Sequence, residues 1–239
     1  MIDLSTTLGN AWFPSPLFTA SGCASSGKEL AQFIDLREIG AVVTKSVMSK
    51  PRHGRPTPRM AETPSGMINS IGLQGPGIDA FLAHDLPWLV SQKARVIVSI
   101  AGETVEEYAT LARKVRSAPG ISALEVNISC PNVENRGLVF ACDPEASRRV
   151  IDGVRKTLGG ELPIIAKLSP DVTDLVSIAK GVVEAGADGL ALINTVLSMV
   201  INLDTMRPQL AGKTGGLSGP AIRPIAVRAI YQVHEALPH

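Results

Sequence analysis

Six short apolar segments, each ending in polar residues, alternate along the chain with longer segments of helical pattern. The polar ends are Ser21, Lys45, Ser99, Asn127, Lys167 and Asn194. This alternation predicts a parallel sheet whose strands are joined by crossover helices. In a closed β/α barrel the carboxyl ends of all strands meet around one site, whereas an open sheet uses mainly its switch point. The even distribution of polar ends therefore favours a barrel.

The pattern also predicts where the elements lie. A hairpin turning at Gly9-Asn10 comes first. The expected strands are 16–20, 41–46, 95–101, 123–129, 163–170 and 189–195, and the expected helices are 25–36, 78–93, 104–116, 143–159, 173–186 and 220–237. Thr104 and Glu107 have capping-box spacing, and Asp143-Pro144 is typical of an N-cap followed by the first helical position.

Composition narrows the class of protein. The 239 residues are 45% hydrophobic, enough for the core of one large α/β domain, and the net charge of +1 gives no electrostatic case for nucleic acid or an anionic membrane. No apolar run reaches transmembrane length and the N-terminus lacks a signal-peptide pattern, so we expect a cytoplasmic protein. Cys23, Cys130 and Cys142 are widely spaced with no Cys-x-x-Cys pair. They suit a reducing compartment and predict neither a metal site nor an iron–sulfur cluster.

Two long segments interrupt the alternation, at 49–77 and 196–219, and both are rich in glycine. Structureless loops of this length are usually functional in a compact domain, although a surface insertion is the alternative. Asn69 and Leu73 alternate with glycines and not with solvating charges, which favours a functional loop. Gly72, Gly75 and Gly77 would let the backbone approach a ligand closely.

The segment 123–132 carries the most distinctive chemistry. Alternation places Leu124, Val126 and Ile128 on one face, and Glu125, Asn127 and Ser129 on the other. A polar row inside a core is costly unless a ligand or a polar network satisfies it. Cys130 stands where the strand ends. A lone cysteine is more often an inert buried thiol, but a thiol at this position is a candidate base or nucleophile.

Two lysines and four asparagines likewise allow either a structural or a functional interpretation. Lys45 and Lys167 could each be a buried lysine paired to a carboxylate such as Glu125, or together a pair of cations facing an anionic ligand or a flavin ring. The scarcity of carboxylates at the strand ends favours the second interpretation. Four amides, whose groups both donate and accept, could recognise a planar, imide-like substrate, although each alone is more often part of a turn. These amides are Asn69, Asn127, Asn132 and Asn194.

Several motifs resemble one enzyme family. Asn127-Ile-Ser-Cys-Pro-Asn132 is similar to the active-site segment of the dihydroorotate dehydrogenases. The same resemblance is carried by Met67-Ile-Asn-Ser-Ile-Gly-Leu-Gln-Gly-Pro-Gly77, Thr44-Lys-Ser46, Ala166-Lys-Leu-Ser-Pro170 and Ile193-Asn-Thr195. Lys213-Thr-Gly-Gly-Leu-Ser-Gly-Pro220 resembles the NAD-linked type 1B catalytic subunit in particular. Together these motifs extend over essentially the whole chain.

The resemblance implies an FMN-containing (β/α)8 TIM barrel that oxidises dihydroorotate to orotate in pyrimidine biosynthesis. Cys130, as the thiolate, would take the C5 proton, and the C6 hydride would pass to N5 of FMN. The loop from Cys130 to about Phe140 would cover the substrate. Lys167 would favour the anionic reduced flavin.

The resemblance also implies the residues that bind the two ligands. Cofactor contacts would come from Ala20, Ser21, Thr44, Lys45, Ser46, Ser99, Asn127, Lys167, Ile193 and Gly219. Substrate contacts would come from Lys45, Asn69, Ser70, Ile71, Gly72, Leu73, Asn127, Asn132, Asn194 and Thr195. Ser99 stands where the family more usually has asparagine, so a shorter side chain stands at one expected flavin contact.

For partners, the resemblance implies a subunit that carries FAD and a [2Fe–2S] cluster and passes electrons to NAD, with a homodimer of this chain inside a heterotetramer. The pattern predicts a single barrel domain over residues 1–239 with about six of the eight βα units, without the last two and their phosphate-binding turns. Two alternatives follow. One is an inactive, flavin-free fragment, and the other is a flavin barrel of the related dihydropyrimidine dehydrogenase type.

Overall fold

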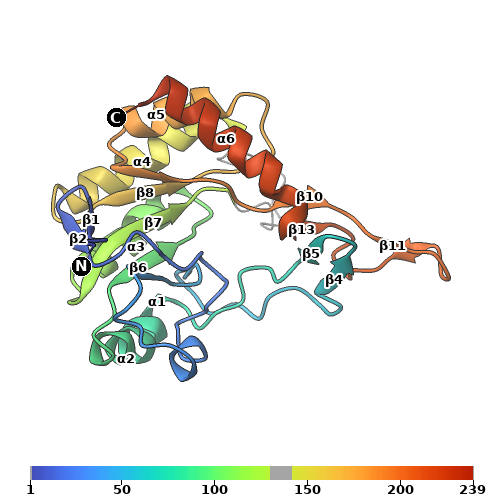
Figure 1. Cartoon of the computed structure of the whole chain (residues 1–239), viewed down its shortest axis with the longest axis horizontal. Coiled ribbons are helices and arrows are strands. Elements are labelled where there is room, and N and C mark those ends of the chain that lie inside the picture. The colour runs from blue at the N-terminus through green and yellow to red at the C-terminus, as the bar shows by residue number, and fades with distance from the viewer. Residues whose placement is uncertain (1, 130–141, 239) are drawn as a thin grey trace.

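The computed structural model describes residues 2–129 and 142–238. Its centre is a curled parallel sheet of five strands in the order β3-β6-β7-β8-β9 (Figure 1). These strands are β3 (Val42–Val43), β6 (Val96–Ile100), β7 (Ile121–Asn127), β8 (Ile164–Lys167) and β9 (Gly189–Ala191). The prediction of an α/β fold built on parallel strands is therefore confirmed, as a partial barrel.

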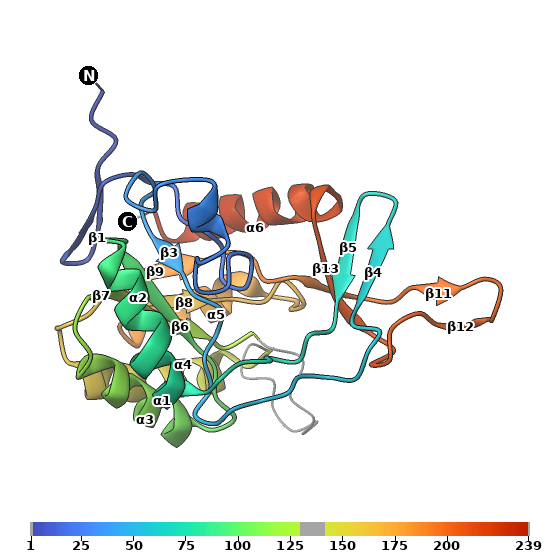
Figure 2. The same cartoon turned by 90° about the horizontal axis from the view of Figure 1, so that it is seen from below.

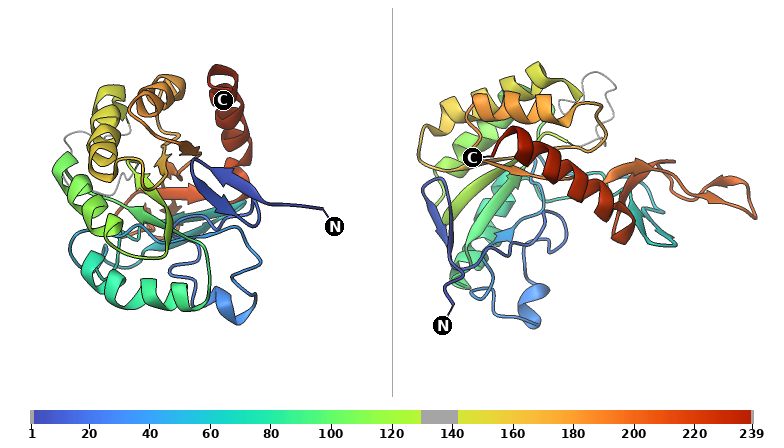
Figure 3. Two further views of the ribbon diagram at one scale, coloured as in Figure 1. Left: turned by 90° about the vertical axis from the view of Figure 1, so that its left-hand side faces the viewer. Right: turned by 45° about the horizontal axis from the view of Figure 1, so that its top comes forward.

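Helices cover the outer side of this sheet, as the left view of Figure 3 shows. They are α1 (Ile78–Ala80), which continues through a π-helical turn (Phe81–Asp85) into α2 (Leu86–Ser91), then α3 (Val105–Arg116), α4 (Pro144–Leu158), α5 (Leu175–Glu184) and α6 (Arg223–Ala236). A single 3-10 turn (Pro220–Ile222) leads into α6. No helix within the described ranges is both long and apolar enough to span a membrane.

The predicted caps fix the starts of two helices. The Thr104 hydroxyl accepts a hydrogen bond from the Glu107 amide, but the Glu107 carboxylate accepts from the Glu103 amide, one residue before the capping-box position. Asp143 accepts from the amides of Glu145 and Ala146, at 2.9 and 3.3 Å. Because these signals are local, the sequence alone located both helix starts.

The two faces of the sheet bury different sets of side chains. The outer face packs against the helices in one large apolar cluster that includes Val98, Leu124 and Val126. The inner face carries a smaller cluster of Phe13, Ala41, Val43, Ile97, Ala123 and Ile165. Phe13 belongs to the amino-terminal hairpin of β1 (Thr6–Leu8) and β2 (Ala11–Phe13). Since the hairpin packs apolar groups at one end of the interior, the polar residues gather at the other.

The two long glycine-rich segments form a second, antiparallel sheet in the order β10-β13-β5-β4. It consists of β4 (Met60–Thr63), β5 (Gly66–Asn69), β10 (Val196–Ser198) and β13 (Gly215–Ser218). We call this sheet the cover. A further hairpin of β11 (Ile201–Asn202) and β12 (Arg207–Pro208) projects beyond it (Figure 2). The segment 49–77, expected to be an irregular loop, contains β4 and β5, because the pairing of β5 with β13 joins parts of the chain that no local pattern connects.

Two other predicted elements differ in the structure. The expected strand 16–20 contributes only a bridge between Phe18 and Ala41. The expected helix 25–36 is a series of turns with one 3-10 turn at Leu30–Gln32. Gly27 has φ +81°, which a right-handed helix cannot accommodate, and a side chain there would touch Leu36 and Leu89. Tertiary packing therefore overrides the helical pattern in this segment.

Candidate active site

A cavity of about 540 Å³ lies where the carboxyl ends of the parallel strands meet the cover. Eleven of the residues expected to bind cofactor or substrate line it: Ser21, Lys45, Ser46, Asn69, Ile71, Gly72, Leu73, Asn127, Lys167, Asn194 and Thr195. They come from strand ends and loops spread over most of the chain. The prediction that the polar strand ends converge is therefore confirmed, except that Ser99 lies behind the lining.

Strand register explains why the inner polar residues face one another. Asn127 on β7 stands beside Lys167 on β8, and Ser99 on β6 stands beside Glu125 on β7. Neighbours across a parallel ladder point to the same side, and alternation turns Glu125 and Asn127 inward together. We call Ser46, Ser99, Glu125, Asn127 and Lys167 the polar floor.

Hydrogen bonds hold the Asn127 amide in one orientation. Its nitrogen donates to the Ser46 hydroxyl at 2.9 Å, and its oxygen accepts from the Ser129 hydroxyl at 2.9 Å. The Ser129 hydroxyl in turn accepts from the side-chain nitrogen of Asn194. The Tyr108 hydroxyl donates to the Asn127 carbonyl at 2.7 Å. The amide is thus set before any ligand arrives, which lowers the entropy lost on binding.

The remaining described residues of the expected set do not line the cavity. They are Ala20, Thr44, Ser70, Ser99, Ile193 and Gly219. Thr44 and Ser99 are fully buried, and the Ser99 amide donates to the Thr44 hydroxyl at 3.1 Å. The Ser99 hydroxyl lies 2.9 Å from that of Ser46, so it supports a lining residue. Cys130 and Asn132 lie outside the described residues.

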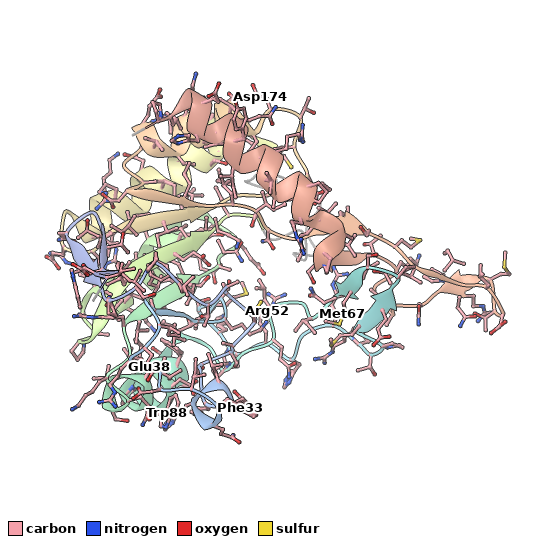
Figure 4. The ribbon with its side chains drawn as sticks, in the orientation of Figure 1. Phe33, Glu38, Arg52, Met67, Trp88 and Asp174 are labelled. Atoms are coloured by element: carbon pink, nitrogen blue, oxygen red, sulfur yellow. The ribbon has the colours of Figure 1, made fainter. Side chains whose placement is uncertain are left out.

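The glycine-rich loop serves its own packing as well as the cavity. Gly72 has φ +76°, and a Cβ atom there would come within 2.9 Å of the Arg55 backbone nitrogen. At Gly77, with φ +82°, it would come within 2.8 Å of the Pro51 nitrogen. These two glycines permit close contact between loop segments, and only Gly72 lines the cavity. Arg52 in the same region (Figure 4) holds the loop to Glu103 by an ion pair of 2.9 Å.

Sequence reasoning missed several lining residues: Gly22, Cys23, Met60, Met67, Glu125 and Ser218. Met67, labelled in Figure 4, lies on β5, and Met60 pairs with the same strand from β4. Nothing local marks these methionines, because their position depends on how the cover folds over the floor. Glu125 could have been found, since alternation already placed it beside Asn127 on the inner face.

Comparison with known proteins agrees with this geometry. Residues 3–239 match the family model described as dihydroorotate dehydrogenase. The chain belongs to the dihydroorotate dehydrogenase family. Three relatives carry the name dihydroorotate dehydrogenase B (NAD(+)), catalytic subunit. That of Desulforudis audaxviator is 52% identical over 236 residues, that of Geotalea daltonii 49% over 235, and that of Anoxybacillus flavithermus 47% over 237. The alignments cover 98–99% of this chain and 75–76% of those proteins.

Within this member of the family, the least expected group of the floor is the Glu125 carboxyl. The residue is 3% exposed, and its Oε1 atom has no hydrogen-bond partner among the described residues. Burial raises the pKa of Glu125, against weaker opposing effects of the Lys167 charge and of the hydroxyls of Ser99 and Ser21. The idea that Glu125 neutralises a buried lysine is therefore incomplete, since Lys167 acts on the carboxyl through its charge alone.

Proposed function

We propose that this chain oxidises dihydroorotate to orotate, in pyrimidine biosynthesis, with FMN bound in the cavity. One observation carries the proposal. The residues that resemblance assigns to flavin and substrate come from distant segments, yet eleven of them line the same cavity. The relatives named as catalytic subunits of dihydroorotate dehydrogenase B support the same reaction.

The polar floor fits the ring of a flavin. A flavin ring carries both acceptor and donor atoms along one edge, and the floor offers an oriented amide at Asn127, an ammonium group at Lys167 and the unpaired oxygen of Glu125. Buried polar atoms without partners are rare, so an orphaned oxygen beside a cavity indicates a ligand. The bound flavin supplies the hydride-accepting chemistry.

Dihydroorotate carries an imide-like edge and a carboxylate, and the other wall of the cavity fits both. Asn69 on β5 and Asn194 after β9 present amides from opposite elements. Lys45, after β3, supplies a cation for the substrate carboxylate. Leu73, from the loop after β5, also lines the cavity and adopts a left-handed φ of +54°. These groups would hold the ring in place while a proton and a hydride leave neighbouring carbons.

Cys130 is our candidate for the general base, on the strength of the motif Asn127-Ile-Ser-Cys-Pro-Asn132. Its thiolate would take the C5 proton of dihydroorotate. Cys130→Ser should slow reduction of bound flavin about 100-fold or more at neutral pH, recover at alkaline pH, and leave flavin affinity unchanged. Cys142→Ser is the matched control, because Cys142 does not line the cavity, and partial desolvation together with the Asp171 charge raises the pKa of its thiol. Equal loss in both variants would remove Cys130 from the mechanism.

The decisive test of the function is anaerobic mixing of the FMN-loaded protein with dihydroorotate. Loss of the visible flavin absorbance, with orotate formed in equal amount, is the expected result. Dihydrouracil lacks the carboxylate and is the discriminating substrate, since preference for it would favour the dihydropyrimidine dehydrogenase alternative. No bleaching by either compound would contradict the proposal.

The relatives' name implies that a separate subunit completes the enzyme. We propose that this partner carries FAD and a [2Fe–2S] cluster, takes electrons from FMN and passes them to NAD, and that the whole is a heterotetramer built on a homodimer of this chain. With dihydroorotate, the isolated chain should reduce artificial dyes but not NAD. Robust NAD reduction by the isolated chain would contradict this arrangement.

A further inference from the structure

Glu125 is a buried acid that the fold itself does not satisfy. It sits in the middle of β7, its side chain lines the cavity, and its Oε1 atom has no hydrogen-bond partner in the described part of the chain. The described structure gives the neighbouring polar groups partners, such as Asn127 with Ser46 and Ser129. The hydroxyls of Ser99 and Ser21 act on the carboxyl, yet a buried oxygen without a partner is costly in the empty protein, so the group is expected to gain a further partner from the occupant.

The surroundings of Glu125 determine its chemical form. The titratable groups that line the cavity among the described residues are Cys23, Lys45, Glu125 and Lys167. Lys167, from the neighbouring β8, favours the ionised carboxylate, as do the hydroxyls of Ser99 from β6 and Ser21 from the loop after the Phe18 bridge. Burial outweighs them and raises the pKa of Glu125. A raised pKa widens the pH range in which this carboxyl is protonated, and a protonated carboxyl can donate a hydrogen bond, which a carboxylate cannot.

We propose that Glu125 is a ligand-contacting residue of the polar floor, and that its carboxylic acid group donates a hydrogen bond to an acceptor atom of the bound flavin ring. Lys167 and Glu125 then offer two different donors to the same planar group, one charged and one neutral. This inference rests on the proposed flavin site and adds to it a contact that the sequence resemblance does not assign.

The test measures flavin affinity by fluorescence quenching in wild type, Glu125→Leu and Glu125→Gln. The probes are FMN and riboflavin, since riboflavin presents the ring without the phosphate. Glu125→Leu removes the donor and should weaken riboflavin binding about tenfold, the size expected of one hydrogen bond in a desolvated site. Its flavin-free form should be as stable as wild type or more so, because an unsatisfied acid has been removed. Glu145→Leu, on the exposed surface of α4, is the control and should leave riboflavin affinity unchanged and lower stability only slightly, through loss of the exposed pair with Arg148.

Glu125→Gln separates the neutral donor from the carboxylate, and it keeps the shape of the side chain if the leucine variant does not fold. The amide also donates, so its affinity should match that of wild type at pH values where the wild-type acid is protonated. As pH rises through the folded pKa of Glu125, wild-type affinity should fall more steeply than that of the glutamine variant, because only the wild type loses a donor by ionising. Comparing the two profiles cancels the titration of the flavin phosphate, the cysteines and the lysines.

The outcomes distinguish this inference from the proposed function. Parallel pH profiles in wild type and Glu125→Gln, or undiminished riboflavin binding in a folded Glu125→Leu, would overturn the role of Glu125 and leave the flavin site standing. Lower stability of flavin-free Glu125→Leu with unchanged affinity would make Glu125 a structural residue. Failure of wild type to bind either flavin would overturn the flavin site itself.

Discussion

The floor and the cover of the cavity are built on different physical principles. The floor rests on parallel strands that are buried on both faces, between the helices outside and the apolar cluster inside. The cover is an antiparallel sheet whose own buried cluster consists of Ala61, Ile68 and Leu210. Several of its apolar side chains are half exposed, among them Met60 at 52% and Leu197 at 51%.

This contrast indicates a division of labour. Groups that must keep an exact orientation, such as Asn127 and Lys167, project from a sheet that is costly to deform because its core is close-packed. The groups that we propose for the substrate, such as Asn69 on β5, belong to a thinner layer with fewer buried contacts, which is expected to open at lower free energy. The predictions that follow separate the two layers, beginning with the largest expected effect.

The core beneath the floor should dominate stability. Leu124 lies fully buried on the outer face of β7, and Leu124→Ala should lower the free energy of unfolding by about 2–5 kcal/mol. Leu203, 81% exposed between β11 and β12, is the matched control. Leu203→Ala should change the free energy of unfolding by less than about 0.5 kcal/mol. Urea denaturation measures both. Similar losses of unfolding free energy in Leu124→Ala and Leu203→Ala would contradict the view that the packed core beneath the floor dominates stability.

The charge of the floor should matter more for ligands than for folding. Lys167→Met removes a cation from the cavity and should weaken FMN binding about 10- to 100-fold, the range of a hydrogen bond to a charged group. Lys156→Met is the control, because Lys156 forms an exposed pair with Asp152 on α4. Fluorescence titration with FMN gives both affinities. A Lys167→Met protein that binds FMN as wild type does would place the flavin away from this lysine.

Close packing inside the cover should control substrate affinity. A Cβ atom at Gly216 on β13 would lie only 1.9 Å from the Thr195 hydroxyl oxygen, so Gly216→Ala must displace a residue of the cavity wall. We expect orotate affinity to fall about tenfold, in line with the cost of overpacking. Gly160→Ala is the control, since no atom lies within 4 Å of the added carbon. Calorimetric titration with orotate measures the affinity of both variants. Equal affinities for Gly216→Ala and Gly160→Ala would show that the cover accommodates the added carbon without disturbing the substrate site.

The smallest effect concerns pH. Burial raises the pKa of Glu125 above its usual 4.5, so the unfolded chain releases this proton at lower pH than the folded one. Glu125 therefore costs least stability below pH 4.5, and the stability of the flavin-free protein declines as pH rises from there through the folded pKa, by at most about 1.4 kcal/mol per pH unit. Glu125→Gln should remove this decline in urea unfolding of the flavin-free protein.

Glu145 provides the opposite case for comparison. The hydrogen bond from Arg148 lowers the pKa of Glu145, so its contribution is present above the usual pKa and is lost as pH falls. Glu145→Gln should therefore lower stability weakly at neutral pH, and the difference from wild type should vanish on the acid side, where wild type has lost the contribution as well. A Glu125→Gln protein whose stability follows wild type at every pH would show that this acid is not perturbed in the folded state.

Local patterns in the sequence determined much of the floor. Alternation along 123–129 placed Glu125, Asn127 and Ser129 on one face, and the caps at Thr104 and Asp143 fixed the starts of two helices. These features depend on neighbours within a few positions, so they survive in any fold that forms the strand or the helix. The convergence of polar strand ends followed from parallel topology, because all parallel strands end on the same side of the sheet.

Only the tertiary structure decided the cover and the state of Glu125. The hydrogen bond from the Asn69 side chain to the Gly216 carbonyl joins residues 147 positions apart, and no local propensity selects that register. Gly27 likewise turns away from the expected helix because Leu36 and Leu89 pack against it. The sequence shows an acid on the inner face at Glu125, but whether it finds a partner there depends on every element around it. Desolvation and pairing are properties of the assembled interior, and they set the chemistry of this cavity.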